Sequence, residues 1–343
     1  MKKLLNTLYI TSEDKYLSLD SANVVIKEDG SEVGRVPLHN LQMIVCFSRL
    51  GASPALMGKC AEENISLVFL KPNGAYLARV EGKTRGNVLL RKTQYQVSED
   101  LQRSIVISRN MILGKVYNAR WVIERMKRDH SLQVDVERLT KVSGKMYESL
   151  NIVAACDSPD KLRGYEGELA AEYFSVFDEM ILQQKEDFFF HERTRRPPLD
   201  NVNALLSFCY TLLTTMTAAA LETVGLDPCV GFLHADRPGR YSLALDLMEE
   251  LRPALADRFV LRLINKRIVT VKDFVKKEDG AVLLTDEARK MVLDEWQKRK
   301  QEEIRHPYLK EKIQWGMVPH AQAMLLVRYL RGDIDAYPPF FWK

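Results

Sequence analysis

Residues 98–130 read SEDLQRSIVISRNMILGKVYNARWVIERMKRDH, and this stretch decides the fold because its pattern differs from that of the residues before it. Apolar residues recur at intervals of three and four, the period of an α-helix with one buried face. Ser98 and Asp100 are residue types that start helices. The segments that follow keep the same period, so we predict a largely helical region from here onward.

Upstream of this stretch the sequence is typical of β-strands. Runs such as NVVIKEDGSEVGRVPL (23–38) are short, rich in β-branched residues and broken by the turn pairs Asp29-Gly30 and Asn73-Gly74. One helix interrupts them, where Ser53-Pro54 precedes ALMGKCAEEN. We therefore predict a small, mostly antiparallel β domain with one helix.

Together these patterns predict an α+β protein with a β-rich domain over 1–95 and an α-helical domain over 96–343. Within the second domain, Asp279-Gly280 predicts a short hairpin and Thr285 caps the helix after it. The tail DIDAYPPFFWK (333–343) is too rich in proline and aromatic residues for a helix.

The uncharged stretch NVNALLSFCYTLLTTMTAAAL (201–221) approaches the length of about 20 residues that spans a bilayer. Its Asn, Ser and Thr content favours the central buried helix of a soluble domain, so we expect no membrane.

The start of the chain lacks the pattern of a signal peptide, and five cysteines without a C-x-x-C pair favour reduced thiols. We expect a cytoplasmic protein.

Glu166 is a candidate functional carboxylate in LRGYEGELAAEYFSVF (162–177). The small residues Gly167, Ala170 and Ala171 offer a helix face that another helix can approach closely, so Glu166 would be partly buried. A partly buried carboxylate needs a cation or a hydrogen-bond donor beside it. The alternative is an ordinary surface or capping glutamate, as Glu168 on the same helix is expected to be.

A second candidate lies in GFLHADRPGRYSLALDLMEELRP (231–253). His234 ends an apolar stretch beside a tight loop, and Ser242 starts a helix on which Asp246 and Glu249 are neighbours three residues apart. Imidazole and carboxylates together suit manganese or a magnesium-like ion that keeps water positions open. Such an ion can hold a scissile phosphate.

The net charge of the chain is +4, but residues 79–128 alone carry twelve Lys or Arg against four acids. Such a stretch is typical of a surface that binds DNA phosphates. A solvated helix face is an equally good interpretation of the charge count. The candidate DNA-binding residues are Arg79, Lys83, Arg85, Arg91 and Lys92.

Three segments, in this order and at these separations, resemble the CRISPR adaptation integrases, the first of the numbered Cas proteins. They are LRGYEGELAAEYF, the stretch from RRPPLDNVNALLSFCY to VGFLH, and GRYSLALDLMEELRP. The resemblance covers nearly the whole chain, and the sequences of these segments are most similar to members of subtype I-C. It implies that Glu166, His234 and Glu249 are catalytic ligands of Mg²⁺ or Mn²⁺, with Asp246 near the metal.

The resemblance also implies what the protein does. The family contains metal-dependent DNA endonucleases and integrases that join the 3′-hydroxyl ends of short foreign duplexes to the CRISPR repeat array by transesterification. They work as homodimers, for which the β-rich domain would be the dimerisation domain, and they assemble with the small second Cas protein on double-stranded and branched DNA.

Two other functions fit the same residues. One is a stand-alone nuclease that selects branched DNA structures, for which the same three side chains would serve. The other is a non-catalytic scaffold that bridges DNA, in which those side chains form only a buried polar cluster. The sequence does not separate these functions.

Overall fold

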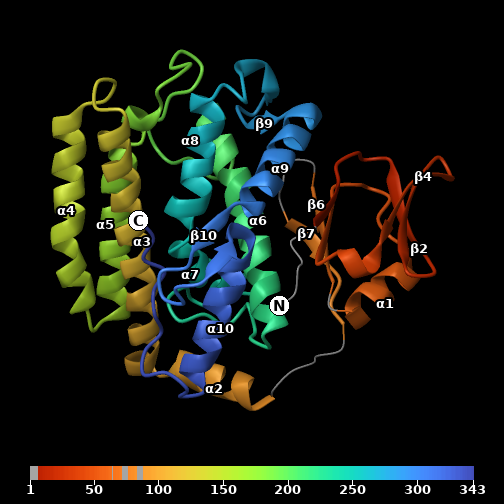
Figure 1. The fold of residues 1–343 in the computed structure, drawn as a ribbon, viewed down its shortest axis with the longest axis horizontal. Coiled ribbons are helices and arrows are strands. Elements are labelled where there is room, and N and C mark those ends of the chain that lie inside the picture. The colour runs from red at the N-terminus through yellow and green to blue at the C-terminus, as the bar shows by residue number, and fades with distance from the viewer. Residues whose placement is uncertain (1–6, 64, 72–75, 83–87) are drawn as a thin grey trace. The chain divides into compact units, whose positions relative to one another are not determined.

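A computed structural model describes residues 7–63, 65–71, 76–82 and 88–343 (Figure 1). The chain is α+β, with a β-sheet region followed by a largely helical region, as predicted. Contacts group it into two compact units. The first comprises 1–85 with 283–302, and the second comprises 86–282 with 303–343.

The first unit contains two sheets, whose strands alternate with turns and one helix. The described strands are β1 (Thr7–Ile10), β2 (Lys15–Asp20), β3 (Asn23–Glu28), β4 (Ser31–Pro37), β5 (Met43–Cys46), β6 (Ser66–Leu70) and β7 (Tyr76–Arg79). Asp29 and Gly30 both have positive φ, 48° and 80°, and close the β3–β4 hairpin as predicted. The Asn73-Gly74 turn lies outside the described residues.

Three of the five described strand pairings in this unit are antiparallel, as predicted, but one of its two sheets is mixed. Strands β2, β3 and β4 form an antiparallel sheet. In the second sheet β5 pairs in parallel with both β1 and β6, and β7 alone pairs antiparallel. The reason is connectivity, because a whole hairpin sheet separates β1 from β5 and helix α1 (Pro54–Glu63) separates β5 from β6. Such long crossovers permit parallel pairing.

Two helices belong to the first unit by their contacts. The predicted helix is α1, whose Leu56 N–H donates to the Ser53 hydroxyl at its start. Contacts also group α9 (Asp286–Gln301) here, although the sequence pattern places it in the helical region. The Arg289 guanidinium of α9 lies 5.4 Å from the centre of the Phe47 ring. Local periodicity cannot predict a side-chain contact between residues so far apart in the chain.

The boundary between strand and helix patterns falls earlier than predicted. Helix α2 (Val88–Glu99) precedes the long helix α3 (Leu101–Asp129), so Ser98 lies in the last turn of α2 and starts no helix. Its hydroxyl donates to the Tyr95 carbonyl. The prediction for Asp100 is confirmed, because its carboxylate caps α3 by accepting from two backbone N–H groups.

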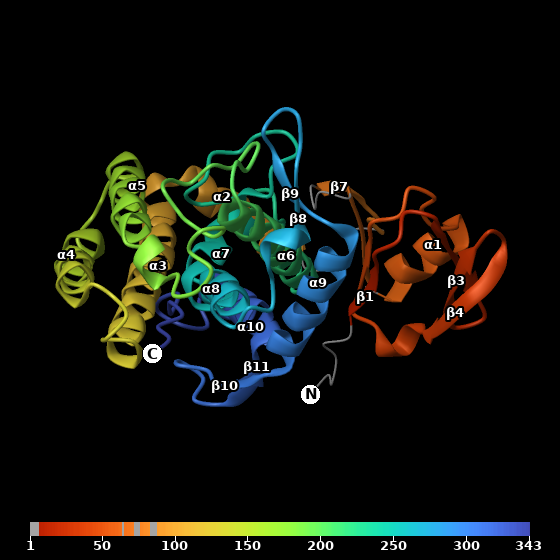
Figure 2. The same cartoon turned by 90° about the horizontal axis from the view of Figure 1, so that it is seen from above.

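The second unit is a helical assembly in which α3, α4 and α5 lie side by side (Figures 1 and 2). Its other helices and short strands follow in chain order. They are α4 (Val136–Ala154), α5 (Pro159–Ser175), α6 (Asn201–Thr223), α7 (Ser242–Glu249), a π-helix (Arg252–Asp257), α8 (Arg258–Asn265), β8 (Phe274–Lys276), β10 (Glu303–Arg305), β11 (Lys312–Gln314) and α10 (Val318–Leu330). Strand β9 (Val282–Leu284) begins at the last residue of the segment 86–282 and continues into the first unit.

Helix α6 is the uncharged stretch noted in the sequence. It is long and apolar enough to cross a membrane by length and composition, but two-thirds of its apolar window is buried inside the protein. It packs against α7 and α10. A helix buried to this extent is a core helix, as the sequence predicts.

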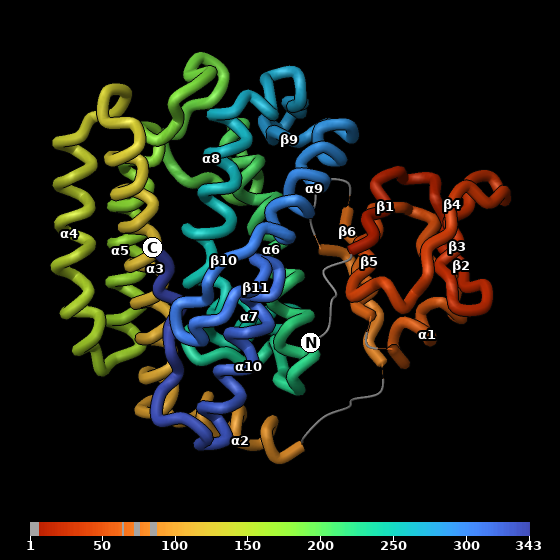
Figure 3. The backbone as a smooth tube through the Cα atoms, in the orientation of Figure 1, coloured from red at the N-terminus to blue at the C-terminus, as the bar shows by residue number. Residues whose placement is uncertain are grey.

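The predicted Asp279-Gly280 turn joins β8 to β9, and Thr285 caps α9 by accepting from the Ala288 N–H. After α10 the chain is non-helical, as expected, and turns back beside α3 (Figure 3). There the Asn118 amide donates to the Phe340 carbonyl and accepts from the Trp342 N–H. The tail is thus fixed to α3.

Candidate active site

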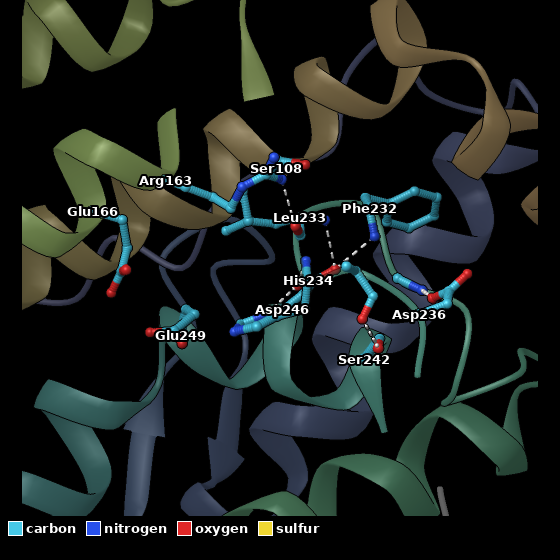
Figure 4. Close-up of polar contacts among 12 residues, drawn as sticks. Ser108, Arg163, Glu166, Phe232, Leu233, His234, Asp236, Ser242, Asp246 and Glu249 are labelled. Carbon is cyan, nitrogen blue, oxygen red and sulfur yellow. Dashed lines mark hydrogen bonds and ion pairs between the residues drawn. The ribbon is translucent and has the colours of Figure 1, made fainter. Parts of the chain in front are cut away.

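The site is built on a loop that carries His234 into α7. Four backbone or ring donors of this loop converge on the buried carboxylate of Asp246, the fifth residue of that helix. Oδ2 accepts from Phe232 N–H at 2.6 Å and Leu233 N–H at 2.9 Å, while Oδ1 accepts from the His234 N–H at 3.0 Å and its ring Nδ1 at 2.6 Å. Asp246 therefore organises the loop (Figure 4).

The same carboxylate fixes the tautomer of His234. Because Nδ1 donates to Asp246, the lone pair of Nε2 is left available as a metal ligand. Gly231 permits this close packing, since a Cβ there would lie 2.7 Å from Asp246 Oδ2. The family resemblance places Asp246 near the metal. In the structure its carboxylate hydrogen-bonds to Nδ1 of His234 and so orients the imidazole ring.

Two neighbouring helices hold the loop from the other side. The Arg163 guanidinium of α5 donates to the Leu233 carbonyl at 3.1 Å, and the Ser104 hydroxyl of α3 donates to the Phe232 carbonyl at 2.7 Å. The Arg163 bond ties the histidine loop to α5, the helix that carries Glu166, and the Ser104 bond ties it to α3. The site is therefore assembled from segments that are far apart in sequence.

Glu166 of α5 and Glu249 of α7 face the same cation, the ammonium of Lys115 on α3. Lys115 Nζ hydrogen-bonds to Glu166 Oε1 and lies 2.7 Å from Glu249 Oε2. Figure 4 shows the two carboxylates turned towards a common space with His234 beside it. The Glu166 side chain is 28% exposed, whereas that of Glu249 is 3% exposed.

The surroundings of Glu249 keep it ionised although it is buried. Burial would raise the pKa of this carboxyl, but Arg252, Lys115 and His234 lower it to about 2. The Arg252 guanidinium lies 3.0 Å from Oε1. Within the described residues Glu249 Oε2 makes no hydrogen bond of normal geometry. The negative charge on this oxygen is therefore balanced by the nearby Lys115 ammonium. An anionic carboxylate at this position attracts a cation.

The donor set fits a divalent cation of the magnesium or manganese class, because two carboxylates and an imidazole nitrogen are suitable ligands. The Lys115 ammonium already occupies a cation position between the two carboxylates. As the side chains stand, the described part of the chain contains no three His, Cys, Asp or Glu residues grouped closely enough to hold an ion. The Lys115 ammonium thus occupies the space between the two carboxylates.

The face of α5 around Glu166 differs from the sequence prediction. Gly167 and Ala171 are exposed, and no atom of the described residues would lie within 4 Å of a Cβ on Gly167, whereas Ala170 is half-buried. Glu166 is partly buried because α3 brings Lys115 to it. Glu168 is a surface residue as expected, and it pairs with Lys145 at 3.1 Å.

Sequence reasoning missed Lys115, Arg252 and Arg193. Asn203 of α6 accepts from Arg193 at 2.6 Å, and Arg193 and Arg252 both stack on the ring of Tyr210. Arg252 follows Glu249 by three residues on a helical segment, which was a usable signal for an ion pair. Lys115 gave no such signal, because it was one of many basic residues in the stretch 79–128.

The structure describes three of the five candidate DNA-binding residues. Arg79 pairs with Glu81 at 2.6 Å, while Arg91 and Lys92 lie on α2. Lys83 and Arg85 lie outside the described residues. Further along the basic stretch, Lys127 and Arg128 also form ion pairs with acids on their own helix. Part of the positive charge is thus balanced by acidic residues of the chain itself.

Comparison with known proteins gives one consistent result. The family model for the CRISPR associated protein Cas1 matches residues 8–298. CRISPR-associated endonuclease Cas1 2 of Rhodospirillum rubrum is 52% identical over 347 residues, with both chains fully covered. CRISPR-associated endonuclease Cas1 1 of Chlorobaculum tepidum is 47% identical over 343 residues, again with full coverage of both.

Solved structures share the fold at lower identity. A casposase bound to integration product matches with a TM-score of 0.84 and 23% identity, covering 98% of this chain and 93% of that chain. A Cas1 protein from Thermotoga maritima matches with a TM-score of 0.78 and 22% identity, covering 95% and 97%. These similarities establish the architecture of the chain.

Proposed function

Because this chain belongs to the Cas1 family of CRISPR-associated proteins, we propose that it cuts and joins DNA at a divalent-cation site formed by Glu166, His234 and Glu249. The chain is an endonuclease and integrase of CRISPR adaptation. The observation that carries the site assignment is the pair of carboxylates from α5 and α7 that face one cation beside His234.

The cation is Mg²⁺ or Mn²⁺, which when bound neutralises charge on the reacting phosphate and lowers the pKa of an attacking hydroxyl. The protein supplies the geometry. Glu166 and Glu249 offer carboxylate oxygens from two helices, and Asp246 holds the imidazole of His234 with Nε2 turned away from itself. Arg252 keeps a positive charge beside Glu249 whether or not the cation is present.

The reaction that suits this site is transesterification. The 3′-hydroxyl oxygen of a short duplex forms a bond to the phosphorus at the edge of a CRISPR repeat, and the bond from that phosphorus to the old 3′-oxygen breaks. The hydroxyl loses its proton and the departing oxygen gains one, so the number of phosphodiester bonds is unchanged. Water in place of the hydroxyl would give hydrolysis at the same site.

The partners follow from the family and from the sequence. We propose double-stranded and branched DNA as substrates, a homodimer formed through the β-rich domain, and assembly with the small second Cas protein. In this proposal residues 1–95 form the dimerisation domain and residues 96–343 the catalytic domain, although helix α2 already begins at Val88. The sequences of the three motifs support an assignment to subtype I-C. The five free cysteines support action in the cytoplasm, where thiols stay reduced.

Alanine substitutions test the proposal in an assay with a labelled duplex and a plasmid that carries the repeat. We expect Glu166→Ala, His234→Ala and Glu249→Ala each to abolish cutting and joining while duplex binding is retained. Glu168→Ala on the same helix is the matched control, because its carboxylate pairs with Lys145 on the surface. We expect that variant to keep full activity.

Two outcomes would contradict the proposal. If the three variants still cut DNA, the catalytic site lies elsewhere. If they lose duplex binding in step with activity, the residues serve DNA binding or folding. Hydrolysis by the unchanged protein without any joined product would favour the stand-alone nuclease.

A further inference from the structure

Lys115 is the residue that two acidic side chains of the site share. Its ammonium contacts Glu166 on α5 and Glu249 on α7, and the Lys115 side chain is only 14% exposed. Helix α3 delivers it there because Gly114, the residue before it, lets the backbone approach closely: a Cβ on Gly114 would lie 2.8 Å from Glu250 Cβ. The backbone position of Lys115 is therefore fixed by packing, whereas its side chain remains a flexible stem.

A metal ion and this ammonium need the same oxygens. An ion bound by Glu166 and Glu249 would lie between their carboxylates, where Lys115 Nζ already lies 2.7 Å from Glu249 Oε2. Two cations at such short separation repel strongly in a poorly hydrated site. One must leave before the other binds, and lysine has a long flexible stem that allows it to move away.

We propose that Lys115 is a tethered competitor of the divalent cation, which closes the site when metal is absent and is displaced when metal binds. This inference rests on the proposed metal site. In the metal-free protein Lys115 compensates the buried Glu249 charge, which would otherwise lower the stability of the fold. The same ion pairs weaken metal binding, because each bound ion must first break both of them.

The test measures Mn²⁺ affinity of the full chain without DNA, from the electron paramagnetic resonance signal of free Mn²⁺. Lys115→Met removes the charge and keeps a similar length. Because both competing ion pairs are then lost, we expect Mn²⁺ to bind roughly tenfold more tightly or better. Lys115→Arg keeps a cation between the carboxylates and should bind Mn²⁺ much less tightly than Lys115→Met.

Lys145 provides a matched control. It also bridges two glutamates, Glu168 at 3.1 Å and Glu172 at 2.6 Å, but on the surface. Lys145→Met changes the net charge by the same amount, so it should leave Mn²⁺ affinity unchanged. Equal tightening in both methionine variants would show a general charge effect and would overturn the proposal.

A second measurement needs no variant and so does not depend on whether Lys115→Met folds. The amine of Lys115 should react slowly with an acetylating reagent in the metal-free protein and faster after Mn²⁺ is added, as followed by mass spectrometry. The rate at Lys145 should stay constant. No change at Lys115 in the presence of bound Mn²⁺ would overturn the proposal.

Mn²⁺ binding separates a failure of the Lys115 competitor from a failure of the metal site. Mn²⁺ binding that is insensitive to Lys115 would refute the competitor and leave the metal site standing. An absence of Mn²⁺ binding in the unchanged protein and in all variants would refute the metal site, and the competitor with it.

Discussion

At the scale of single residues, Asp246 is a positioning residue that acts through His234. Its carboxylate accepts four hydrogen bonds from the histidine loop, and an amide in its place would direct donors at donors. We expect Asp246→Asn to weaken Mn²⁺ binding roughly tenfold to hundredfold, as when the support of a metal-binding histidine is removed. Calorimetric titration of Mn²⁺ into the protein measures this.

Asp236→Asn is the control for that change. Asp236 is exposed and accepts one backbone hydrogen bond in the same loop, from Gly231 at 3.3 Å. Its replacement should leave Mn²⁺ affinity unaltered. If Asp246→Asn also binds Mn²⁺ as the unchanged protein does, the orientation of His234 does not depend on this carboxylate.

Asp257 predicts a pH dependence of stability, although it is not one of the proposed metal ligands. Burial raises its pKa from 3.8 to about 6, against the lowering effect of the Tyr210 hydroxyl, which donates to it at 2.6 Å. Between these two values the folded state holds a proton that the unfolded state releases. The free energy of unfolding therefore falls as pH rises through this window, by on the order of 3 kcal/mol.

Urea unfolding at several pH values between 4 and 7 tests this. Asp257→Asn cannot titrate, so its stability should lose this component of the pH dependence. The informative quantity is the difference between the two proteins, because other carboxyl groups titrate in both. A difference that stays constant with pH would show that folding does not raise the pKa of Asp257.

At the scale of elements, the approach of α3 to Glu250 fixes the site. Gly114→Ala would force its new Cβ into Glu250 and displace Lys115 next to it. We expect a loss of about 1–3 kcal/mol in the free energy of unfolding, measured in urea, together with reduced activity. Gly144 on α4 has no atom within 4 Å of such a Cβ, so Gly144→Ala should be neutral or stabilising. Equal effects of the two changes would mean that α3 can shift without cost.

Some elements were predictable from local sequence and others were not. The Asp100 cap, the Asp29-Gly30 turn and the buried helix α6 were predictable, because each depends on residues next to one another in the chain. Helix α2 was missed because its β-branched and aromatic residues hid a helical spacing of buried positions, Leu90, Gln94 and Val97. The parallel ladders were missed because pairing order depends on the path of the connections.

The same limit applies to the site. Glu166, His234 and Glu249 could be named from motif resemblance, and the loop-supporting role of Asp246 required coordinates. Lys115 is separated from Glu166 by 51 residues, so their ion pair arises from the packing of α3 against two other helices. No spacing rule within one segment could have singled it out among its basic neighbours.

At the scale of the whole molecule, DNA binding should weaken steeply with salt, because binding to phosphates releases counterions. Replacing Arg91 and Lys92 of α2 with alanine should flatten the slope of log affinity against log salt by about 1 for each basic side chain that no longer binds a phosphate. Arg128 is the comparison residue, because it pairs with Asp129 at 2.8 Å. Filter binding over a series of salt concentrations measures the slopes, and an unchanged slope would place the DNA surface elsewhere.

The most direct measurement is a crystal structure of the protein soaked in Mn²⁺, with the ion located by anomalous scattering. We predict one ion bonded to the carboxylates of Glu166 and Glu249 and to Nε2 of His234, with the Lys115 ammonium moved away from both acids. An ion bound elsewhere at saturating Mn²⁺, with Lys115 still paired to Glu166 and Glu249, would contradict the assignment of this site.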